Sequence, residues 1–202
     1  MQRVGVFGGS FDPIHMGHLW IGEAAKEQLR LDQLRWVPAA TSPLKRHGAT
    51  ASASDRLEMV RLAVSGDSQS IVDDREIQRG EISYTVDTIR DLHEENPGAE
   101  RFLIIGSDSL ASMTQWHQPD LLLSLVTLAV VQRGGEPEID FGSLKSLISA
   151  EQIECFRQHV IRMPVIEISS SEIRQRVSEH RSIRHRVPRP VEAFIQAKQL
   201  YG

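Results

Sequence analysis

The chain has 202 residues, 40% of them hydrophobic and 25% charged, and a formal net charge of −4. This length suits one α/β core, and the negative charge argues against broad nucleic-acid binding through a basic surface. The single cysteine, Cys155, excludes an internal disulfide framework. No apolar run approaches the roughly 18 residues that cross a bilayer, and no basic-then-apolar leader opens the chain. We therefore expect a cytoplasmic protein with no membrane partner.

The first predicted elements are a strand, a glycine turn and a helix. The apolar run VGVF at residues 4–7 precedes GGSFDPIHMGH at residues 8–18, and Ile21, Ala25 and Leu29 then recur with helical spacing. Two adjacent glycines allow positive φ, and unpaired N–H groups at a helix start attract anions, so the pattern predicts a phosphate site. The segment is neither a Walker loop nor the G-x-G-x-x-G dinucleotide motif.

Two histidines close this segment. His15 and His18 are three residues apart, so both imidazoles can face one phosphate from the first turn of the helix. Gly17 between them carries no side chain to block the ligand. Two alternatives stay open on the residues alone: a capped turn with incidental histidines, or part of a zinc site, for which no third ligand stands at a telling spacing.

The next elements continue the alternation of strands and helices. Residues 34–38 form a predicted strand, and a helix capped by Asp55 follows, which is typical of parallel βαβ units. Between them, residues 39–54 are interpreted as a mobile loop on the ligand side of the sheet. Its Lys45 is a candidate phosphate contact, with a solvated surface lysine as the alternative.

A further strand at residues 70–73 precedes the run SYTVDT at residues 83–88. A helix begins within this run, with Ser83 or Thr85 as its predicted N-cap.

Polar residues follow the two strands predicted to be most buried. The strand at residues 101–105 runs into Gly106 and Asp108, which suit close backbone approach and a hydrogen bond to ribose. The strand at residues 125–131 leads to Arg133, which we expect to point toward the ligand crevice. Trp116 lies among polar neighbours and is either a wall of the site or a core residue.

The second distinctive stretch is IEISSSEIR at residues 166–174. Ser169 and Glu172 have the spacing of a capping box, so the stretch predicts at least a well-capped helix. With Ser170 and with Arg174 one turn in, it also predicts a second anion site. The arginines that continue to residue 189 are mostly interpreted as a solvated face.

These motifs together resemble the nucleotidylyltransferase superfamily. The H-x-G-H signature is present, and GGSFDP, SYT-x-DT, Gly-x-Asp followed by tryptophan, and the ISSSEIR run are similar to nicotinate-nucleotide adenylyltransferases. Three positions depart from the family pattern: Leu44 replaces a histidine, Ser171 replaces a threonine and keeps the hydroxyl, and Gly134 replaces a proline. We expect the last change to loosen the turn after Arg133.

The resemblance implies a Rossmann-like, doubly wound, mostly parallel sheet in a single α/β domain over residues 1–202. Residues 164–202 would form a helical part that completes the ATP site. It implies transfer of AMP from ATP to nicotinate mononucleotide, giving nicotinate adenine dinucleotide and pyrophosphate in NAD biosynthesis. Mg²⁺ would accompany ATP, held by phosphate and water with no protein ligand. The expected partners are these two substrates and no nucleic acid, with a homo-oligomer left open.

The resemblance also implies roles for the matched residues. The catalytic candidates are His15, His18 and Arg174. The candidate ATP-binding residues are Gly8, Gly9, Ser10, Phe11, His15, His18, Lys45, Gly106, Asp108, Ile168, Ser170 and Arg174. The candidate acceptor-binding residues are Asp12, Lys45, Tyr84, Thr85, Trp116 and Arg133. Within this last set, the backbone N–H groups of Tyr84 and Thr85 would receive the nicotinate carboxylate.

Other functions remain as alternatives. The same chemistry could use nicotinamide mononucleotide or phosphopantetheine as acceptor, and Trp116 with the segment around Tyr84 argues for a pyridine nucleotide. A nucleotide-binding sensor without turnover is opposed by the intact His15, His18 and Arg174. A tRNA synthetase is disfavoured by the size of the chain and by the missing anticodon-binding and Lys-Met-Ser-Lys-like elements.

Overall fold

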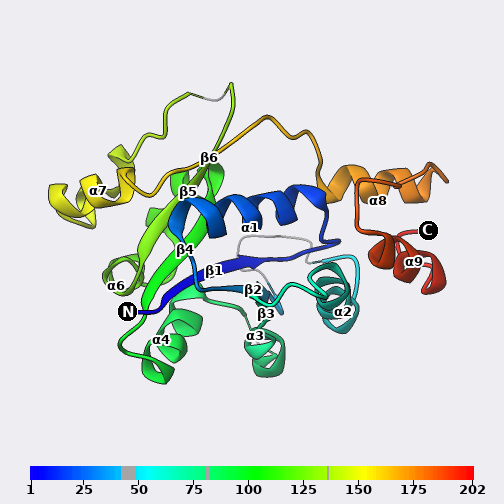
Figure 1. The fold of residues 1–202 in the computed structure, drawn as a ribbon, viewed down its shortest axis with the longest axis horizontal. Helices are drawn as coiled ribbons and strands as arrows, with labels where there is room; N and C mark the ends of the chain where they lie inside the picture. Colours follow the sequence, from blue (N-terminus) through cyan, green and yellow to red (C-terminus); the bar gives the residue numbers. More distant parts are fainter. Residues whose placement is uncertain (42–48, 81, 136) are drawn as a thin grey trace. The chain divides into compact units, whose positions relative to one another are not determined.

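The structure is a computed structural model that describes residues 1–41, 49–80, 82–135 and 137–202 (Figure 1). Lys45 lies outside the described residues, so its predicted phosphate contact stays a prediction. The described chain divides into two compact units. Unit 1 consists of Met1–Gly8, Ile21–Arg35 and Tyr84–Val165, and unit 2 of Gly9–Trp20, Trp36–Ser83 and Ile166–Gly202.

The described strands form one six-stranded sheet in the order β3-β2-β1-β4-β5-β6. The strands are β1 (Arg3–Gly9), β2 (Gln33–Pro38), β3 (Ser70–Val72), β4 (Glu100–Gly106), β5 (Thr127–Arg133) and β6 (Ile161–Met163). The β1–β4, β4–β5 and β5–β6 pairs are parallel. This order is that of the doubly wound Rossmann fold, in which ligands bind beyond the carboxyl ends of the strands where the order reverses. The predicted fold class is confirmed.

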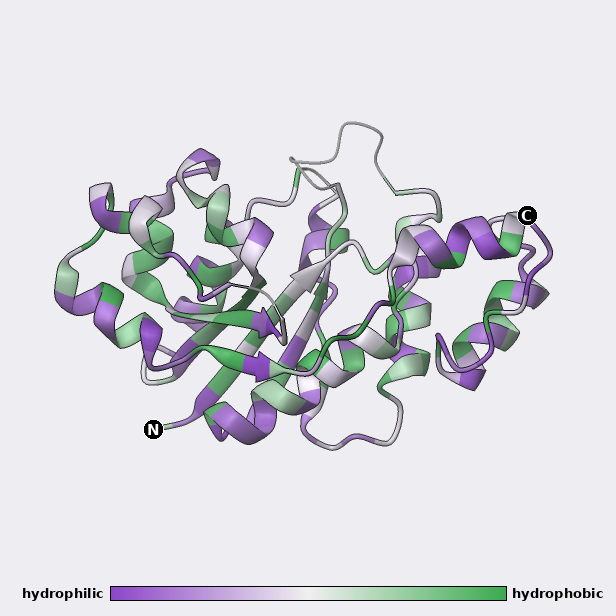
Figure 2. Ribbon diagram, turned by 90° about the horizontal axis from the view of Figure 1, so that it is seen from above, coloured by the Kyte–Doolittle hydropathy of each residue, from purple (hydrophilic) through white to green (hydrophobic). Residues whose placement is uncertain are grey.

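The core of unit 1 surrounds β4 and β5. Phe102, Leu103 and Ile104 of β4 are buried, as are Leu128 and Val130 of β5, and Figure 2 shows the central strands largely in the green of apolar residues. This unit holds α1 (Met16–Leu29) from Ile21 onward, together with α4 (Thr85–Glu95), α5 (Ser107–Ala111), α6 (Pro119–Leu125) and α7 (Ala150–Arg157), and the 3-10 turns η1 (Met113–Gln115) and η2 (Gly142–Ser146). Buried strands end here at exposed Gly106 and Arg133.

Unit 2 is mainly helical. It contains the first turn of α1 (Met16–Leu29) and the helices α2 (Ala53–Ala63), α3 (Arg75–Arg79), α8 (Ser170–Ser178) and α9 (Arg189–Ala197). Val191 and Ile195 on α9 are buried, and α9 packs against α2. Among the described residues, no helix combines the length and apolarity that a membrane span requires.

Two of the three predicted helix caps are wrong. Ser169 caps α8 as predicted, because its hydroxyl accepts from the N–H of Glu172. The cap of α2 is Ser52, whose hydroxyl accepts from the N–H of Asp55, so Asp55 lies inside the helix. Tyr84 occupies the N-cap of α4 without a side-chain bond. Ser83 is used elsewhere, since its hydroxyl accepts from the N–H of Ala40 at 2.9 Å.

The predicted glycine turn is also wrong. Gly8 and Gly9 continue β1, and the carbonyl of Gly9 accepts from the N–H of Ala39 at 2.9 Å. Positive φ occurs instead at Phe11, with a φ of 47°. The buried ring of Phe11 packs edge-on against His18 and near Trp36, with ring centroids 5.1 and 5.9 Å away. Packing of this ring stabilises a backbone conformation that non-glycine residues seldom adopt.

Candidate active site

The two histidines of unit 2 lie together at the start of α1. Their rings stack with centroids 3.7 Å apart and planes 25° from parallel. The backbone N–H of His15 donates to Nδ1 of His18 at 3.3 Å. Because Nδ1 accepts, the ring proton of neutral His18 is on Nε2, which can donate to a phosphate oxygen. The two imidazoles thus lie side by side, and their shared contact with one phosphate stays a prediction.

Close packing explains the glycine between the two histidines. A Cβ atom on Gly17 would lie 3.1 Å from both Cε1 and Nδ1 of the His15 ring, and 3.8 Å from the carbonyl oxygen of Ile168. A methyl group here would push the His15 ring by a few tenths of an ångström. The start of α1 has fewer free N–H groups than predicted. The N–H of Met16, its first residue, donates to the carbonyl of Arg186 at 2.8 Å.

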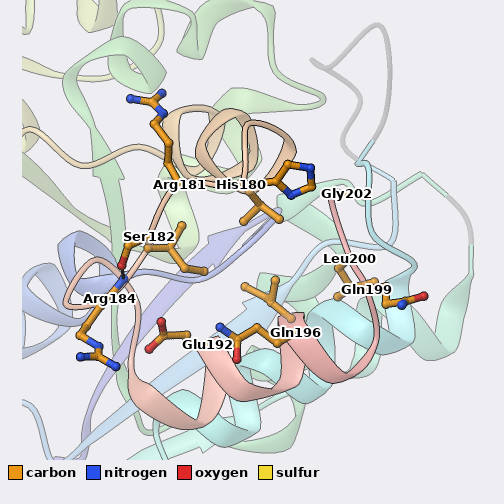
Figure 3. Close-up of a pocket in the computed structure, with 12 residues that line it drawn as sticks. His180, Arg181, Ser182, Arg184, Glu192, Gln196, Gln199, Leu200 and Gly202 are labelled. Atoms are coloured by element: carbon orange, nitrogen blue, oxygen red, sulfur yellow. Dashed lines mark hydrogen bonds between the residues drawn. The ribbon is translucent and has the colours of Figure 1, made fainter.

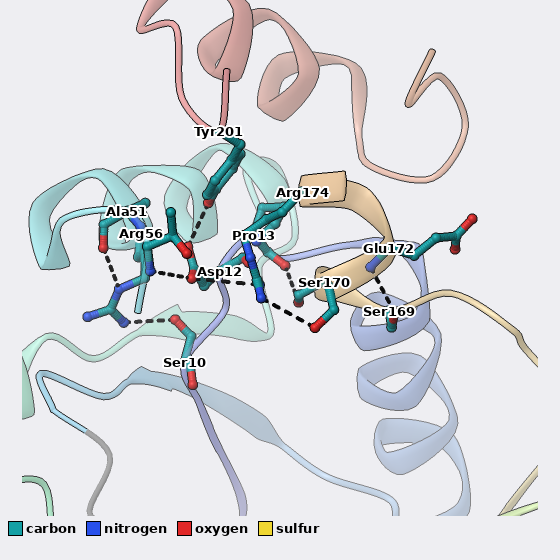
Figure 4. Close-up of polar contacts among 12 residues, drawn as sticks. Ser10, Asp12, Pro13, Ala51, Arg56, Ser169, Ser170, Glu172, Arg174 and Tyr201 are labelled. Carbon is teal, nitrogen blue, oxygen red and sulfur yellow. Dashed lines mark hydrogen bonds and ion pairs between the residues drawn. The ribbon is translucent and has the colours of Figure 1, made fainter. Parts of the chain in front are cut away.

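The start of α8 is attached to the same loop within unit 2. The hydroxyl of Ser170 donates to the carbonyl of Pro13 at 2.9 Å, and Nη1 of Arg174 donates to the carbonyl of Asp12 at 2.6 Å. Nη2 of Arg174 also donates to the hydroxyl of Ser171 at 3.3 Å. The predicted second anion site thus adjoins the first, and Figure 4 shows the contacts of Ser170 and Arg174 with Pro13 and Asp12.

Asp12 is the centre of this network. Its side chain is 4% exposed, and its Oδ2 accepts from the N–H of Thr50 at 2.7 Å. Oδ1 accepts from the N–H of Ala51 at 3.1 Å and from the hydroxyl of Tyr201 at 2.8 Å. The carboxylate therefore connects the loop before α1, the segment before α2 and the end of the chain. Its predicted contact with the acceptor substrate is not tested by these bonds.

Arg56 is a site-supporting residue that the sequence did not indicate. It lies on α2 and is only 2% exposed. Its guanidinium donates to the carbonyls of Ser10 at 2.7 Å, Ala40 at 3.0 Å and Ala51 at 3.4 Å. Burial lowers the pKa of Arg56, which the charge of Asp12 opposes, but arginine remains protonated under ordinary conditions. Arg56 thereby joins the backbone just before Asp12 to the segments that contain Ala40 and Ala51.

Tyr201 is the second residue that the sequence did not indicate. Burial raises the pKa of its hydroxyl, and the charge of Asp12 and the hydrogen bond to it raise it further. The hydroxyl therefore remains a hydrogen-bond donor to Asp12 throughout the neutral range.

The arginines that follow Arg174 are partly used within unit 2. Arg186 pairs with Glu172 at 3.2 Å, and Arg176 lies 3.9 Å from the same carboxylate. Arg181 pairs with Glu179 at 2.6 Å on the surface. Glu172 thus joins α8 to the segment before α9 through Arg186. Arg181 is exposed, as the predicted solvated face requires, whereas Arg186 is half-buried.

The residues predicted for the acceptor lie in unit 1. Tyr84 precedes the first turn of α4, where the helix itself offers no acceptors to the leading N–H groups, including that of Thr85. The Tyr84 ring packs against His117 with centroids 4.4 Å apart. Trp116 is half-buried, and its Nε1–H donates to the hydroxyl of Ser112 at 3.4 Å. Tyr84 and His117 thus form an aromatic pair at the start of α4.

Three further predicted residues lie where strands of unit 1 end. Gly106 ends β4, and a Cβ atom there would have no protein atom within 4 Å. Protein packing therefore does not require this glycine. Asp108 on α5 and Arg133 at the end of β5 are exposed. The expected loosening after Arg133 stays a prediction, and the N–H of Gly134, which proline lacks, donates to the carbonyl of Met163 at 2.7 Å.

The predicted site residues thus fall into two groups. Unit 2 brings together one group, which consists of Gly9, Ser10, Phe11, Asp12, His15, His18, Ile168, Ser170 and Arg174. Unit 1 holds the other, which consists of Gly8, Tyr84, Thr85, Gly106, Asp108, Trp116 and Arg133. In the part of the chain that the structure describes, no three His, Cys, Asp or Glu side chains are grouped as metal ligands.

A separate pocket of about 590 Å³ opens between the end of α8 and α9 in unit 2 (Figure 3). Val177, Ile183 and Ile195 contribute its apolar lining, and His180 and Glu192 are among its polar residues. None of the predicted site residues that the structure describes is among the residues lining this pocket.

Comparisons with known proteins identify a family and several relatives that share one name. Residues 6–176 match the family described as Cytidylyltransferase-like. A protein of Rhodopirellula baltica named "Probable nicotinate-nucleotide adenylyltransferase" is 48% identical over 198 residues, which cover 98% of this chain and 92% of the relative. A protein of the same name from Exiguobacterium sibiricum is 42% identical and covers 100% of both sequences.

Solved structures share the fold. "Plasmodium falciparum nicotinic acid mononucleotide adenylyltransferase complexed with NaAD" matches with a TM-score of 0.75 and 18% identity, covering 100% of this chain and 98% of that one. A structure named as a putative nicotinate-nucleotide adenylyltransferase from Vibrio parahaemolyticus matches with a TM-score of 0.65 and 17% identity, covering 100% and 96%. At these identities the likeness shows the fold alone.

Proposed function

The chain belongs to the nicotinate-nucleotide adenylyltransferase family, within the cytidylyltransferase-like proteins, and we propose that it transfers the adenylyl group of ATP to nicotinate mononucleotide. An oxygen of the 5′-phosphate of the mononucleotide forms a bond to the α-phosphorus of ATP. The bond from that phosphorus to the oxygen bridging to the β-phosphorus breaks, and pyrophosphate leaves. The products are nicotinate adenine dinucleotide and pyrophosphate, and no covalent enzyme intermediate is required.

In this proposal, the group of residues in unit 2 binds the triphosphate. The Nε2–H of His18 and the guanidinium of Arg174 are donors suited to phosphate oxygens, and guanidinium groups bind such oxygens strongly. The start of α8 adds the N–H groups of its first turn, beside the Ser170 hydroxyl. His15 supports His18 by ring stacking. Catalysis then rests on alignment of the nucleotides and on stabilising the charge that develops on the phosphoryl oxygens.

The acceptor nucleotide is assigned to the residues of unit 1. The N–H groups of Tyr84 and Thr85 at the start of α4 suit a carboxylate, which is the group that distinguishes nicotinate from its amide. Trp116 offers a ring on which a pyridine can stack. Arg133 suits the phosphate of the acceptor, whereas Gly106 and Asp108 stay assigned to the ribose of ATP. Lys45 remains assigned to phosphate, and Asp12 remains a candidate contact for the acceptor.

Magnesium enters this proposal as part of the MgATP substrate. The carboxylate of Asp12 already accepts three hydrogen bonds, and the described residues offer no grouped metal ligands. Mg²⁺ commonly keeps several waters and binds substrate phosphates, so it needs no protein cage here.

The observation that carries the proposal is the junction of the two helix starts in unit 2, where Ser170 and Arg174 bond to the loop that bears the histidines. The test is a pyrophosphate-release assay with MgATP and three acceptors side by side: nicotinate mononucleotide, its amide, and phosphopantetheine. We expect the highest kcat/KM for nicotinate mononucleotide, with nicotinate adenine dinucleotide as the product. Preference for another acceptor, or no pyrophosphate with any of them, would contradict the proposal.

A further inference from the structure

Asp12 and Arg174 form an ion pair that is longer than a direct contact. Nη1 of Arg174 is 3.7 Å from Oδ2 of Asp12, whereas charge-assisted N–H···O bonds are about 2.7–2.9 Å long. The guanidinium bonds instead to the main-chain carbonyl of Asp12 at 2.6 Å. A carboxylate that turned toward Arg174 would compete with phosphate for this cation.

Three hydrogen-bond donors prevent the Asp12 carboxylate from rotating toward Arg174. The N–H groups of Thr50 and Ala51 bind one oxygen each, and the Tyr201 hydroxyl binds Oδ1 at 2.8 Å. Tyr201 is the one side chain among these donors, and it reaches Asp12 from the segment after α9 (Figure 4). Its ring is half-buried, and its hydroxyl faces Asp12 with Arg56 and Arg174 as the neighbouring charges.

We propose that Tyr201 is a positioning residue for adenylyl transfer, which keeps the Asp12 carboxylate engaged so that Arg174 stays available to the phosphates of ATP. This inference rests on the proposed function for the role of Arg174. Loss of the hydroxyl leaves Oδ1 with the single backbone donor of Ala51. The carboxylate then rotates toward Arg174, and the tighter ion pair withdraws the guanidinium from the ligand.

A second polar contact of the α9 region does not involve Asp12 and provides a control. Lys198 pairs with Asp55 of α2 at 3.6 Å, with a side chain 56% exposed. Buried Val191 and Ile195 hold α9 independently of either polar contact. Lys198→Ala therefore removes one attachment of the α9 region, whereas Tyr201→Phe removes only the hydroxyl at Asp12 and keeps the ring.

The test measures binding of α,β-methylene-ATP with Mg²⁺ by calorimetry in Tyr201→Phe, Lys198→Ala, Arg174→Ala and the Tyr201→Phe/Arg174→Ala double variant. We expect Tyr201→Phe to raise Kd about 5- to 10-fold and Lys198→Ala to change it less than about 2-fold. In the Arg174→Ala background, Tyr201→Phe should have almost no further effect, because its action requires the guanidinium.

An unchanged Kd in Tyr201→Phe, or the same penalty with and without Arg174, would overturn the positioning role. A purely structural role of the tyrosine predicts that second, additive result. Product formation by the wild type is measured in parallel with nicotinate mononucleotide. If the wild type forms no dinucleotide, the proposed function fails while the binding cycle still decides the role of Tyr201. If dinucleotide forms and the cycle is additive, only the positioning role fails.

Discussion

The residues proposed for phosphate in unit 2 differ from the residues proposed for sugar and acceptor in unit 1 in how the protein holds them. In unit 2, the side chains of Ser170 and Arg174 bond to main-chain carbonyls of the loop that contains Asp12. Buried Arg56 bonds to the carbonyl of Ser10 in the same loop. In unit 1, Gly106, Asp108 and Arg133 are exposed where strands end. The difference teaches that the residues proposed to bind phosphate are pre-organised by the protein's own contacts. Substitutions of the buried residues that support this network, such as Arg56, should lower stability, whereas substitutions in unit 1 should act on substrate affinity.

The largest expected effect is on stability, at Arg56. Arg56→Ala leaves the carbonyls of Ser10, Ala40 and Ala51 without their buried donor, which we expect to lower the free energy of unfolding by about 3 kcal/mol. Urea denaturation measures this change. Arg61→Ala on the same helix removes surface ion pairs and should cost less than about 1 kcal/mol. Equal costs for the two variants would show that the backbone around Asp12 does not depend on Arg56.

The next effect is on turnover, at His18. His18→Ala removes a donor proposed for the transition state, and we expect kcat to fall by about 10²-fold or more with the fold intact. Steady-state rates with MgATP and nicotinate mononucleotide measure the loss, and circular dichroism checks the fold. His180→Ala, which changes an exposed histidine of the same unit, serves as the control. Near wild-type turnover in His18→Ala would remove this histidine from the catalytic assignment.

A pair of glycine substitutions separates the two regions directly. In Gly17→Ala the new methyl group displaces the His15 ring, and we expect kcat to fall about 10-fold. In Gly106→Ala the methyl group meets no protein atom within 4 Å, so stability should hold or rise slightly.

The same Gly106→Ala variant should raise KM for a nucleotide substrate by about 5-fold, because a ligand that approaches this backbone meets the methyl group. Initial rates and thermal unfolding of both variants provide the measurements. If Gly106→Ala leaves both KM values unchanged, the assignment of Gly106 to a nucleotide is wrong.

The smallest effect is a dependence of stability on pH. The raised pKa of Tyr201 means that the folded protein keeps a proton that the unfolded chain loses above about pH 10. The stability that Tyr201 contributes is therefore complete below about pH 10 and is lost as the pH rises beyond it. The Tm of the wild type should fall more steeply than that of Tyr201→Phe between about pH 9 and 11. Parallel curves would contradict this linkage.

The sequence predicts the fold and the two helix starts because local patterns carry them. Alternating strands and amphipathic helices gave the parallel sheet, and the spacing of His15 and His18 gave the stacked pair. The two supporting residues lack such a pattern. Tyr201 lies 189 positions from Asp12 and Arg56 lies 46 positions from Ser10. Each is a single residue, Arg56 on α2 and Tyr201 after α9. The positive φ was assigned to glycines because ring packing around Phe11 is not visible in local sequence.

The claim that the rest depends on is that the loop of the histidines and the start of α8 bind one triphosphate. The most direct test is a crystal structure of the chain with α,β-methylene-ATP and Mg²⁺. We expect phosphate oxygens within hydrogen-bond distance of both Nε2 of His18 and the guanidinium of Arg174. A triphosphate bound elsewhere, such as in the pocket between α8 and α9, with neither side chain in contact, would contradict the account.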